Sequence, residues 1–296
     1  MSATSRLAKI RARLDLPTLR RVAGVLGGHH RSIFTGHGQD FDDMVEYRPG
    51  DEIGDIDWKA SARYGLPMIR RFEHESNLPM VLAVDTGRSM AALAPSGEAK
   101  SEVAMFAADV IAFLARSRGD LVALVAGDAE RLVQLPARDG AQHVEMLLRI
   151  LDQHLQREGP PADLSRVLDR VLTSIKRRTL VVIITDEARP ALSDEDALRR
   201  LRIRHEIMVV SIADQSPVEG DGAERVVDVD HELVLPEFVG ADPRLRAEAE
   251  AAVAARRDRV RQMLRRRGIE HVVAASSDDV VDALIDLFRR QRLARR

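Results

Sequence analysis

The chain has 296 residues, of which 45% are hydrophobic, and this content is enough to build a sizeable folded core. Its 45 lysines and arginines and 47 aspartates and glutamates give a formal charge of -2, which excludes an overall basic field that would attract nucleic acid or anionic lipid. The sequence contains no cysteine, which excludes disulfides, thiolate metal sites and thiol nucleophiles.

In chain order, the first part of the sequence has an irregular pattern. Two short amphipathic helices are predicted at residues 5–14 and 18–26, and no apolar run in the sequence reaches the roughly 18 residues of a membrane span. Farther along, the pattern predicts a helix at residues 58–64 that Asp57 caps. We therefore expect a cytoplasmic protein with no integral membrane segment, in which residues 1–77 form a small N-terminal extension with a helical leader.

From residue 78 on, short apolar runs alternate with helical patterns. Strands rich in valine and isoleucine are predicted at residues 79–85, 121–127, 180–186, 205–214 and 269–276, with a short edge strand at 225–229. Helices are predicted at residues 98–116, 142–156, 164–177, 194–202, 243–267 and 278–292. This alternation predicts one α/β domain over residues 78–296, with a Rossmann-like, doubly wound, mostly parallel sheet that helices cover on both faces.

Two of the predicted strands end in an aspartate, Asp85 and Asp186. Sheets of this class hold their ligands beyond the carboxyl ends of the strands. The segment after the first of these strands, DTGRSM, has neither a glycine-rich phosphate fingerprint nor a lysine before a Ser or Thr, so a nucleotide site is not expected. Carboxylate and hydroxyl oxygens are instead the ligands that Mg²⁺ takes in proteins.

The segment DTGRSM resembles the D-x-S-x-S element of von Willebrand factor A domains, where it forms a metal-ion-dependent adhesion site, and ITDE resembles their later aspartate loop. Upstream, the stretch YRPGDEIGDIDWKASAR is similar to the signature of the DUF58 family. The signature residues in this sequence are Tyr47, Arg48, Gly50, Asp51, Asp57, Trp58 and Arg63. The resemblance implies a von Willebrand factor A-like domain and a non-enzymatic binding module. It also implies a MoxR-type AAA+ ATPase as partner, for which the protein would be an adaptor or co-chaperone in remodelling or maturing a client protein complex.

The resemblance also implies a degenerate metal site. Asp85, Ser89 and Asp186 match oxygen ligands of the family pattern, whereas Gly87 and Ala162 stand at positions where the pattern has hydroxyl side chains. Three side-chain oxygens are few for Mg²⁺, which takes six ligands. We therefore expect Mg²⁺ at low occupancy at most, and no other cofactor.

Several charged residues are candidates for balancing this site or for contacting a partner. Two aspartates at a buried strand end repel each other, so we expect Arg88, in the same loop, to turn inward as an internal cation. The candidates for partner contact are Arg88, Glu187, Arg265, Arg266 and Arg267. The arginines of the helix at residues 254–268 equally fit a solvated face of a core-packing helix.

Two other functions fit parts of the same pattern. One is a metal-dependent hydrolase or phosphoryl-transfer enzyme that uses Asp85 and Asp186 with Mg²⁺, although the sequence offers neither a nucleophile or base nor a phosphate cradle beside them. The other is implied by the resemblance to the DUF58 family: it keeps the binding role and is a maturation factor for methanol dehydrogenase. The histidines lack zinc-binding spacing and the serines lie in no nucleophile elbow, so we expect no catalytic residue.

Overall fold

The computed structural model describes residues 40–47, 56–73, 79–117, 119–216, 227–230, 233–234 and 236–293. These residues form two compact units, one before and one after residues 74–78. The two predicted leader helices and the signature residues Arg48, Gly50 and Asp51 lie outside the described residues.

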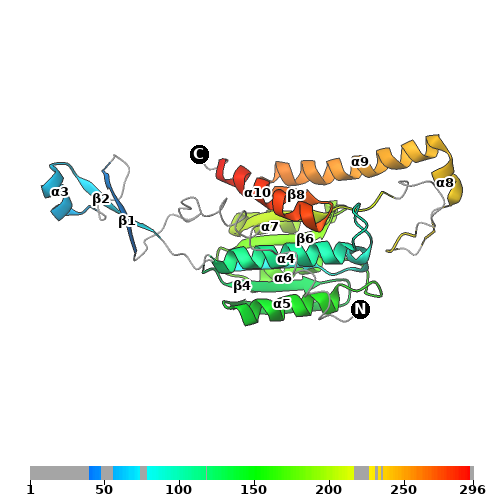
Figure 1. The fold of residues 1–296 in the computed structure, drawn as a ribbon, viewed down its shortest axis with the longest axis horizontal. Helices are drawn as coiled ribbons and strands as arrows, with labels where there is room; N and C mark the ends of the chain where they lie inside the picture. The colour runs from blue at the N-terminus through cyan, green and yellow to red at the C-terminus, as the bar shows by residue number, and fades with distance from the viewer. Residues whose placement is uncertain are drawn as a thin grey trace. The chain divides into compact units, whose positions relative to one another are not determined.

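The first unit consists of an antiparallel strand pair and a short helix (Figure 1). Its elements are β1 (Asp40–Glu46), α3 (Trp58–Tyr64) and β2 (Met68–Glu73). The sequence pattern predicts the helix but neither strand, because acidic and arginine residues interrupt the apolar alternation that marks a strand.

The signature residues in this unit differ in their burial. Asp57 is buried and caps α3 as predicted, since its Oδ1 accepts hydrogen bonds from two N–H groups of the first turn at 2.9 and 3.0 Å. The Tyr47 N–H donates to a loop carbonyl at 2.8 Å. Arg63 is exposed, and Trp58 packs little against its own unit, with 69% of its surface exposed.

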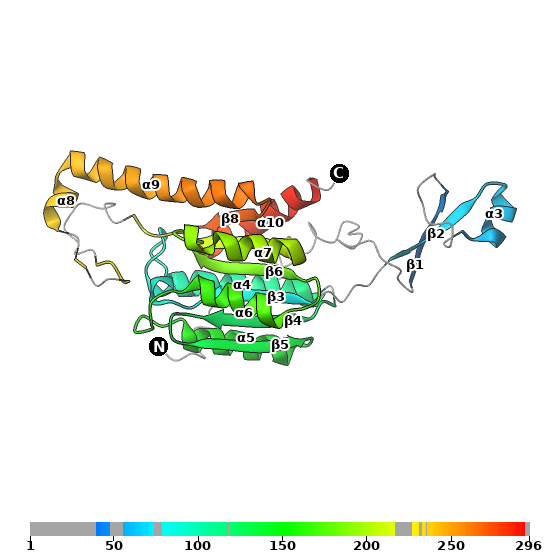
Figure 2. The same ribbon diagram turned by 180° about the vertical axis from the view of Figure 1, so that it is seen from behind.

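The described strands of the second unit form a six-stranded sheet in the order β5-β4-β3-β6-β7-β8 (Figures 1 and 2). The strands are β3 (Met80–Asp85), β4 (Val122–Gly127), β5 (Leu132–Arg138), β6 (Leu180–Asp186), β7 (Glu206–Ile212) and β8 (Glu270–Ala274). All neighbours pair in parallel except β5, which is antiparallel to β4 at the edge. The predicted mostly parallel α/β sheet is confirmed.

The edge of the sheet differs from the prediction. The edge strand is β5, a half-buried strand with Pro136 in it, and proline is tolerated where one side of a strand has no partner. The predicted edge strand at residues 225–229 is described only from Val227 on, and there Val227 forms an isolated bridge with Val234.

Helices cover both faces of this sheet, as predicted. On one face lie α4 (Lys100–Ser117), α5 (Ala141–His154) and α10 (Ser277–Leu293). On the other lie α6 (Leu164–Ser174), α7 (Glu195–Arg204) and the end of α9 (Pro243–Arg266), which follows α8 (Glu237–Ala241). Two 3-10 turns, η2 (Arg88–Ala91) and η3 (Leu192–Asp194), lie in the loops after β3 and β6.

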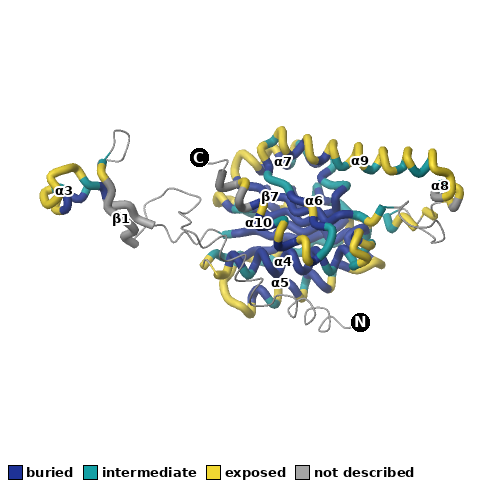
Figure 3. Tube along the Cα trace, turned by 45° about the horizontal axis from the view of Figure 1, so that its top comes forward, coloured by how far each residue is buried: buried dark blue, intermediate teal, exposed yellow. Residues whose placement is uncertain are grey.

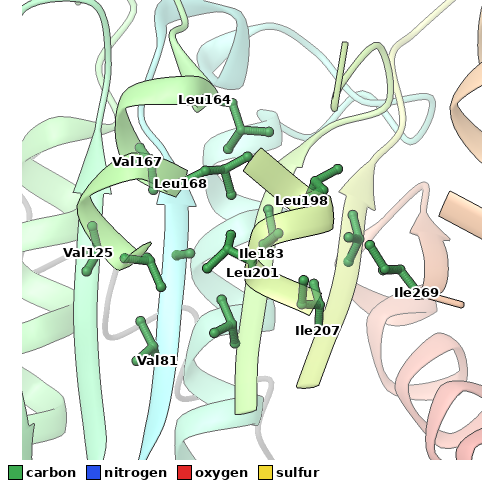
Figure 4. Close-up of a cluster of buried hydrophobic side chains, with 14 of the residues drawn as sticks. Val81, Val125, Leu164, Val167, Leu168, Ile183, Leu198, Leu201, Ile207 and Ile269 are labelled. Carbon is green, nitrogen blue, oxygen red and sulfur yellow. The ribbon is translucent and has the colours of Figure 1, made fainter. Parts of the chain in front are cut away.

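The core between the sheet and α6, α7 and α9 is aliphatic (Figure 4). Leu164, Val167 and Leu168 of α6 pack over Val125 and its neighbours on the central strands. Fully burying one such side chain stabilises the fold by about 1.5–3 kcal/mol. Alternate residues of the same strands face α4 on the other side, which explains why the strands are continuously apolar.

The helix α9 is buried only toward its end. Its buried residues are Val260, Met263 and Leu264, and Figure 3 shows that the turns before them are largely exposed. None of the described helices is long and apolar enough to cross a lipid bilayer.

Candidate functional site

Three acidic residues meet at the carboxyl edge of the sheet. Asp85 ends β3, Asp186 ends β6, and Asp214 follows β7 in the next loop. Because β3, β6 and β7 are parallel neighbours, their carboxyl ends lie side by side. Together with Lys100 and Arg189, whose side chains approach these carboxylates, they form what we call the strand-end cluster.

Asp85 is fully buried and is held by hydrogen bonds on both of its oxygens. Its Oδ1 accepts from the Gly87 N–H at 3.0 Å, and its Oδ2 accepts from the Thr185 hydroxyl at 3.0 Å. The Nε of Arg189 lies 4.0 Å from Oδ2. Burial raises the pKa of Asp85 to about 6, because a charged carboxylate loses its hydration there; the Gly87 hydrogen bond opposes this rise and the charge of Asp186 adds to it.

Lys100, the first residue of α4, supplies the main positive charge of the cluster. Its side chain is completely buried, and its Nζ forms an ion pair with Asp214 Oδ1 and lies 3.7 Å from Asp186 Oδ2. The other oxygen of Asp186 accepts a hydrogen bond from the Ala188 N–H at 2.8 Å. Burial raises the pKa of Asp214 to about 6, and the charge of Lys100 opposes that rise.

Glu187, one of the candidates for partner contact, is held inside the fold. It is 6% exposed, and its Oε1 accepts from Arg257 Nε of α9 at 2.7 Å, with Nη2 of the same arginine at 2.5 Å. Arg257 Nη2 also donates to the Asp214 carbonyl at 3.4 Å. This pair therefore fastens α9 to the carboxyl edge of the sheet.

Arg88 does not have the place that the sequence predicts for it. Its Nη2 donates to the carbonyl of Asp230 at 2.5 Å, on the loop that precedes α8. The cations beside the aspartates are instead Lys100 and Arg189. The local reason is the turn η2, which Arg88 opens, so that its side chain leaves the loop toward residues 227–230.

The positions of the two missing hydroxyl ligands lie in direct contact with each other. A Cβ atom at Gly87 would be 2.3 Å from Ala162 Cα and 2.5 Å from Ala162 Cβ, so no side chain fits at position 87. Ser89 keeps its hydroxyl, which is buried and has no hydrogen-bond partner among the described residues. A lysine ammonium lies beside two of the carboxylates, and Ser89 supplies the one remaining hydroxyl of the family's ligand pattern. The residues present therefore do not fit Mg²⁺. No group of three or more His, Asp or Glu side chains in the described part of the chain has a metal-binding arrangement.

The three arginines at the end of α9 lie away from the cluster. The helix ends before β8 begins, and a parallel strand begins at the amino edge of the sheet, opposite the strand ends. Arg265 and Arg266 are exposed there, whereas Arg267 forms an ion pair with Glu195 of α7 at 2.7 Å. The structure therefore brings together Asp85 and Asp186 but not these arginines, and Ser89 lies in the turn that follows Asp85.

Sequence reasoning misses four members of the site: Lys100, Asp214, Arg189 and Arg257. Asp214 carries a usable signal, since it ends an apolar run just as Asp85 and Asp186 do. Lys100 carries none, because a lysine in the first turn of a predicted helix is ordinarily solvated.

Comparison with known proteins supports a family assignment. The chain is 30% identical over 261 residues to the uncharacterized protein Rv1480 of Mycobacterium tuberculosis, which covers 88% of this chain and 82% of the relative. The uncharacterized protein Mb1516 of Mycobacterium bovis matches to the same extent, with 30% identity over 88% of this chain and 82% of its own length.

Solved structures show weaker likeness. The conserved hypothetical protein BatB from Bacteroides thetaiotaomicron has a TM-score of 0.48 at 14% identity, over 72% of this chain and 98% of its own. A von Willebrand factor type A structure from Catenulispora acidiphila has a TM-score of 0.42 at 12% identity, over 74% of this chain and 43% of its own.

A family model also matches most of the chain. Residues 43–259 match the family described as "Protein of unknown function DUF58", and this range contains the signature segment and the strand-end cluster. The chain therefore belongs to the DUF58 family.

Proposed function

We propose that the protein is a non-enzymatic, cytoplasmic protein-binding module that uses the loops at the carboxyl edge of its sheet. In this role it is an adaptor between a MoxR-type AAA+ ATPase and a client protein. The choice of the ATPase as partner follows from the resemblance of the signature segment.

The observation that carries the proposal is the internal pairing of the acidic side chains at the strand ends. Asp85 accepts hydrogen bonds from Gly87 and Thr185, and Glu187 accepts from Arg257. Asp186 and Asp214 face Lys100. A general base or nucleophile needs a side chain that can reach a substrate, and these carboxylates are occupied by the protein's own donors. Their arrangement favours a site that shapes loops over one that carries out a reaction.

The loops that the cluster shapes carry exposed apolar side chains. Leu93, in the loop after β3, is 50% exposed, and Leu192, in the loop after β6, is 72% exposed. The Leu93 carbonyl accepts a hydrogen bond from the Gln215 N–H at 3.0 Å, which joins the loops after β3 and β7. Exposed leucines on fixed loops are suited to contact a protein partner, because their burial supplies binding energy at little cost in loop ordering.

The test is an affinity capture of the tagged protein from its native lysate in the presence of ATP. A brief crosslink is applied first, and then either Mg²⁺ or EDTA is added. We expect a MoxR-type AAA+ ATPase among the captured proteins by mass spectrometry, in both conditions. Recovery of no AAA+ ATPase in either condition would contradict the adaptor role. Turnover of a phosphoester or ester substrate by the purified protein would contradict the non-enzymatic assignment.

A further inference from the structure

Lys100 lies where a lysine is ordinarily excluded. Its side chain is 0% exposed, and it is among the largest fully buried side chains of the described residues. It is also the first residue of α4, and the amino end of a helix dipole is positive and disfavours a cation. A buried ammonium is retained only when nearby groups balance its charge and complete its hydrogen bonds.

That balance comes from carboxylates at the ends of two neighbouring strands, β6 and β7. Asp214 Oδ1, beyond β7, forms an ion pair with the Lys100 ammonium, and Asp186 Oδ2, at the end of β6, lies 3.7 Å from it. Arg189 has a similar relation to Asp85, at 4.0 Å. Each of the three carboxylates thus has a cationic group of the protein within 4.0 Å.

The loops around the cluster close the space in which the missing metal ligands would lie. The Arg88 N–H donates to the Pro160 carbonyl at 2.9 Å, and Arg189 Nη2 donates to the Ala162 carbonyl at 3.2 Å. The first bond holds the segment before α6 against the loop after β3, and the second holds it against the loop after β6. In this arrangement a Cβ at Gly87 would lie 2.3 Å from the Ala162 backbone. A hydroxyl side chain cannot be restored at position 87 unless these loops separate.

We propose that Lys100 is the resident cation of the strand-end cluster. Its ammonium balances Asp186 and Asp214, the role that a divalent metal ion has in an intact adhesion site. The contact between Gly87 and Ala162 keeps such an ion out. The cluster is then assembled once, on folding, and its loops hold one arrangement whatever the concentration of divalent metal. This inference holds for any partner, because it concerns how the site is formed and not what it binds.

The first part of the test is thermal unfolding of the full-length protein in Mg²⁺, in Mn²⁺ and in EDTA. We expect the same Tm for the wild type in all three. Lys100→Met keeps the length of the side chain and removes the charge, and we expect its Tm to fall by about 10 °C, as for a buried ion pair that loses one partner. The matched control is Lys176→Met, an exposed lysine of the same unit, whose Tm should stay at the wild-type value.

The second part separates lost charge from lost packing. The single substitution Asp214→Asn should lower the Tm. The double variant, Lys100→Met with Asp214→Asn, should nevertheless have a higher Tm than Lys100→Met, because it contains one less unbalanced carboxylate. If Lys100→Met does not fold, purification of a folded double variant would likewise show that the unbalanced charge, and not the lost packing, destabilises the single variant. A wild-type Tm that rises with Mn²⁺ and falls in EDTA would overturn the proposal, as would additive effects of the two substitutions.

Discussion

At the residue scale, His271 gives the protein a pH-dependent contribution to stability away from the strand-end cluster. Its Nε2 lies 3.0 Å from the Ser211 hydroxyl, across the β7–β8 pair. Burial, assisted by the charges of Arg261 and Arg290, lowers the pKa of His271 from its ordinary value of 6.5 to about 4. The folded protein therefore keeps this imidazole neutral at pH values at which the unfolded chain protonates it.

The sign of the effect follows from proton binding. Between about pH 4 and 6.5 the unfolded state binds more protons at His271 than the folded state does, so the free energy of unfolding rises with pH across this range. Because the side chain is partly exposed, the full contribution is of the order of 2 kcal/mol, present above pH 6.5 and lost as the pH falls toward 4.

We predict that His271→Asn removes this contribution. Urea unfolding of wild type and variant at several pH values should give a free-energy difference that grows from pH 4.5 to pH 6.5 and is constant above it. Parallel curves over the whole range would show that the imidazole is protonated equally in both states, against the prediction.

At the element scale, α3 depends on its cap more than on its packing. Ala60 is its buried residue, and the helix is only seven residues long, so little apolar area holds it in place. Asp57 provides two hydrogen bonds to the first turn, and the Ser61 hydroxyl bonds back to the Asp57 carbonyl at 2.7 Å. The same hydroxyl accepts from the Met68 N–H at 2.8 Å, which ties the helix to β2.

We predict that Asp57→Ala loosens this helix by about 1–2 kcal/mol, because two N–H groups lose their acceptor. Amide hydrogen exchange should become faster at residues 58–64 and at the start of β2, while the sheet of the second unit keeps its protection. Asp57→Asn is the matched control, since its side-chain oxygen still accepts. Equal exchange in Asp57→Ala and wild type would refute the role of the cap.

At the scale of the whole molecule, the second unit offers partners two surfaces at opposite edges of the sheet. The carboxyl edge presents Leu93 and Leu192, on loops that the strand-end cluster fixes. The amino edge presents Arg265 and Arg266, where α9 ends. Arg267, unlike Arg265 and Arg266, is engaged within the fold, because its ion pair with Glu195 holds α9 to α7.

We predict that the proposed ATPase partner contacts the carboxyl edge. Leu93→Asp with Leu192→Asp should lower capture of the ATPase about tenfold, because two apolar contacts are lost. Arg265→Glu with Arg266→Glu should leave capture unchanged. Both pairs of residues are exposed, so each double variant should keep the wild-type Tm. A change in capture then results from the altered surface and not from unfolding. The opposite result, with capture lost on arginine reversal, would move the contact to the amino edge.

Most of the second unit's fold is predictable from the sequence because the apolar periods there are strong. The central strands β3, β4 and β6 are runs of buried, mostly aliphatic residues, and most of the predicted helix limits lie within two or three residues of the observed ones. The strands β1, β2 and β5 were not predicted, since each is charged or half-buried and shows little alternation. Asp85 and Asp186 end neighbouring strands, as the sequence predicts, because parallel strand ends share one edge of a sheet. The joint role of Asp85, Ser89 and Asp186 as metal ligands stays a prediction.

The amino-acid sequence by itself determined the α/β architecture, the family and the two aspartates at the strand ends, since these depend on local periods and on residues within one motif. Only the tertiary structure decided which cation balances those aspartates. Lys100 lies far along the chain from Asp186 and Asp214, Arg189 lies far from Asp85, and the parallel sheet brings these partners together. The contact of Gly87 with Ala162 likewise exists only after the loops pack, because side-chain room is a property of the folded interior and not of a motif.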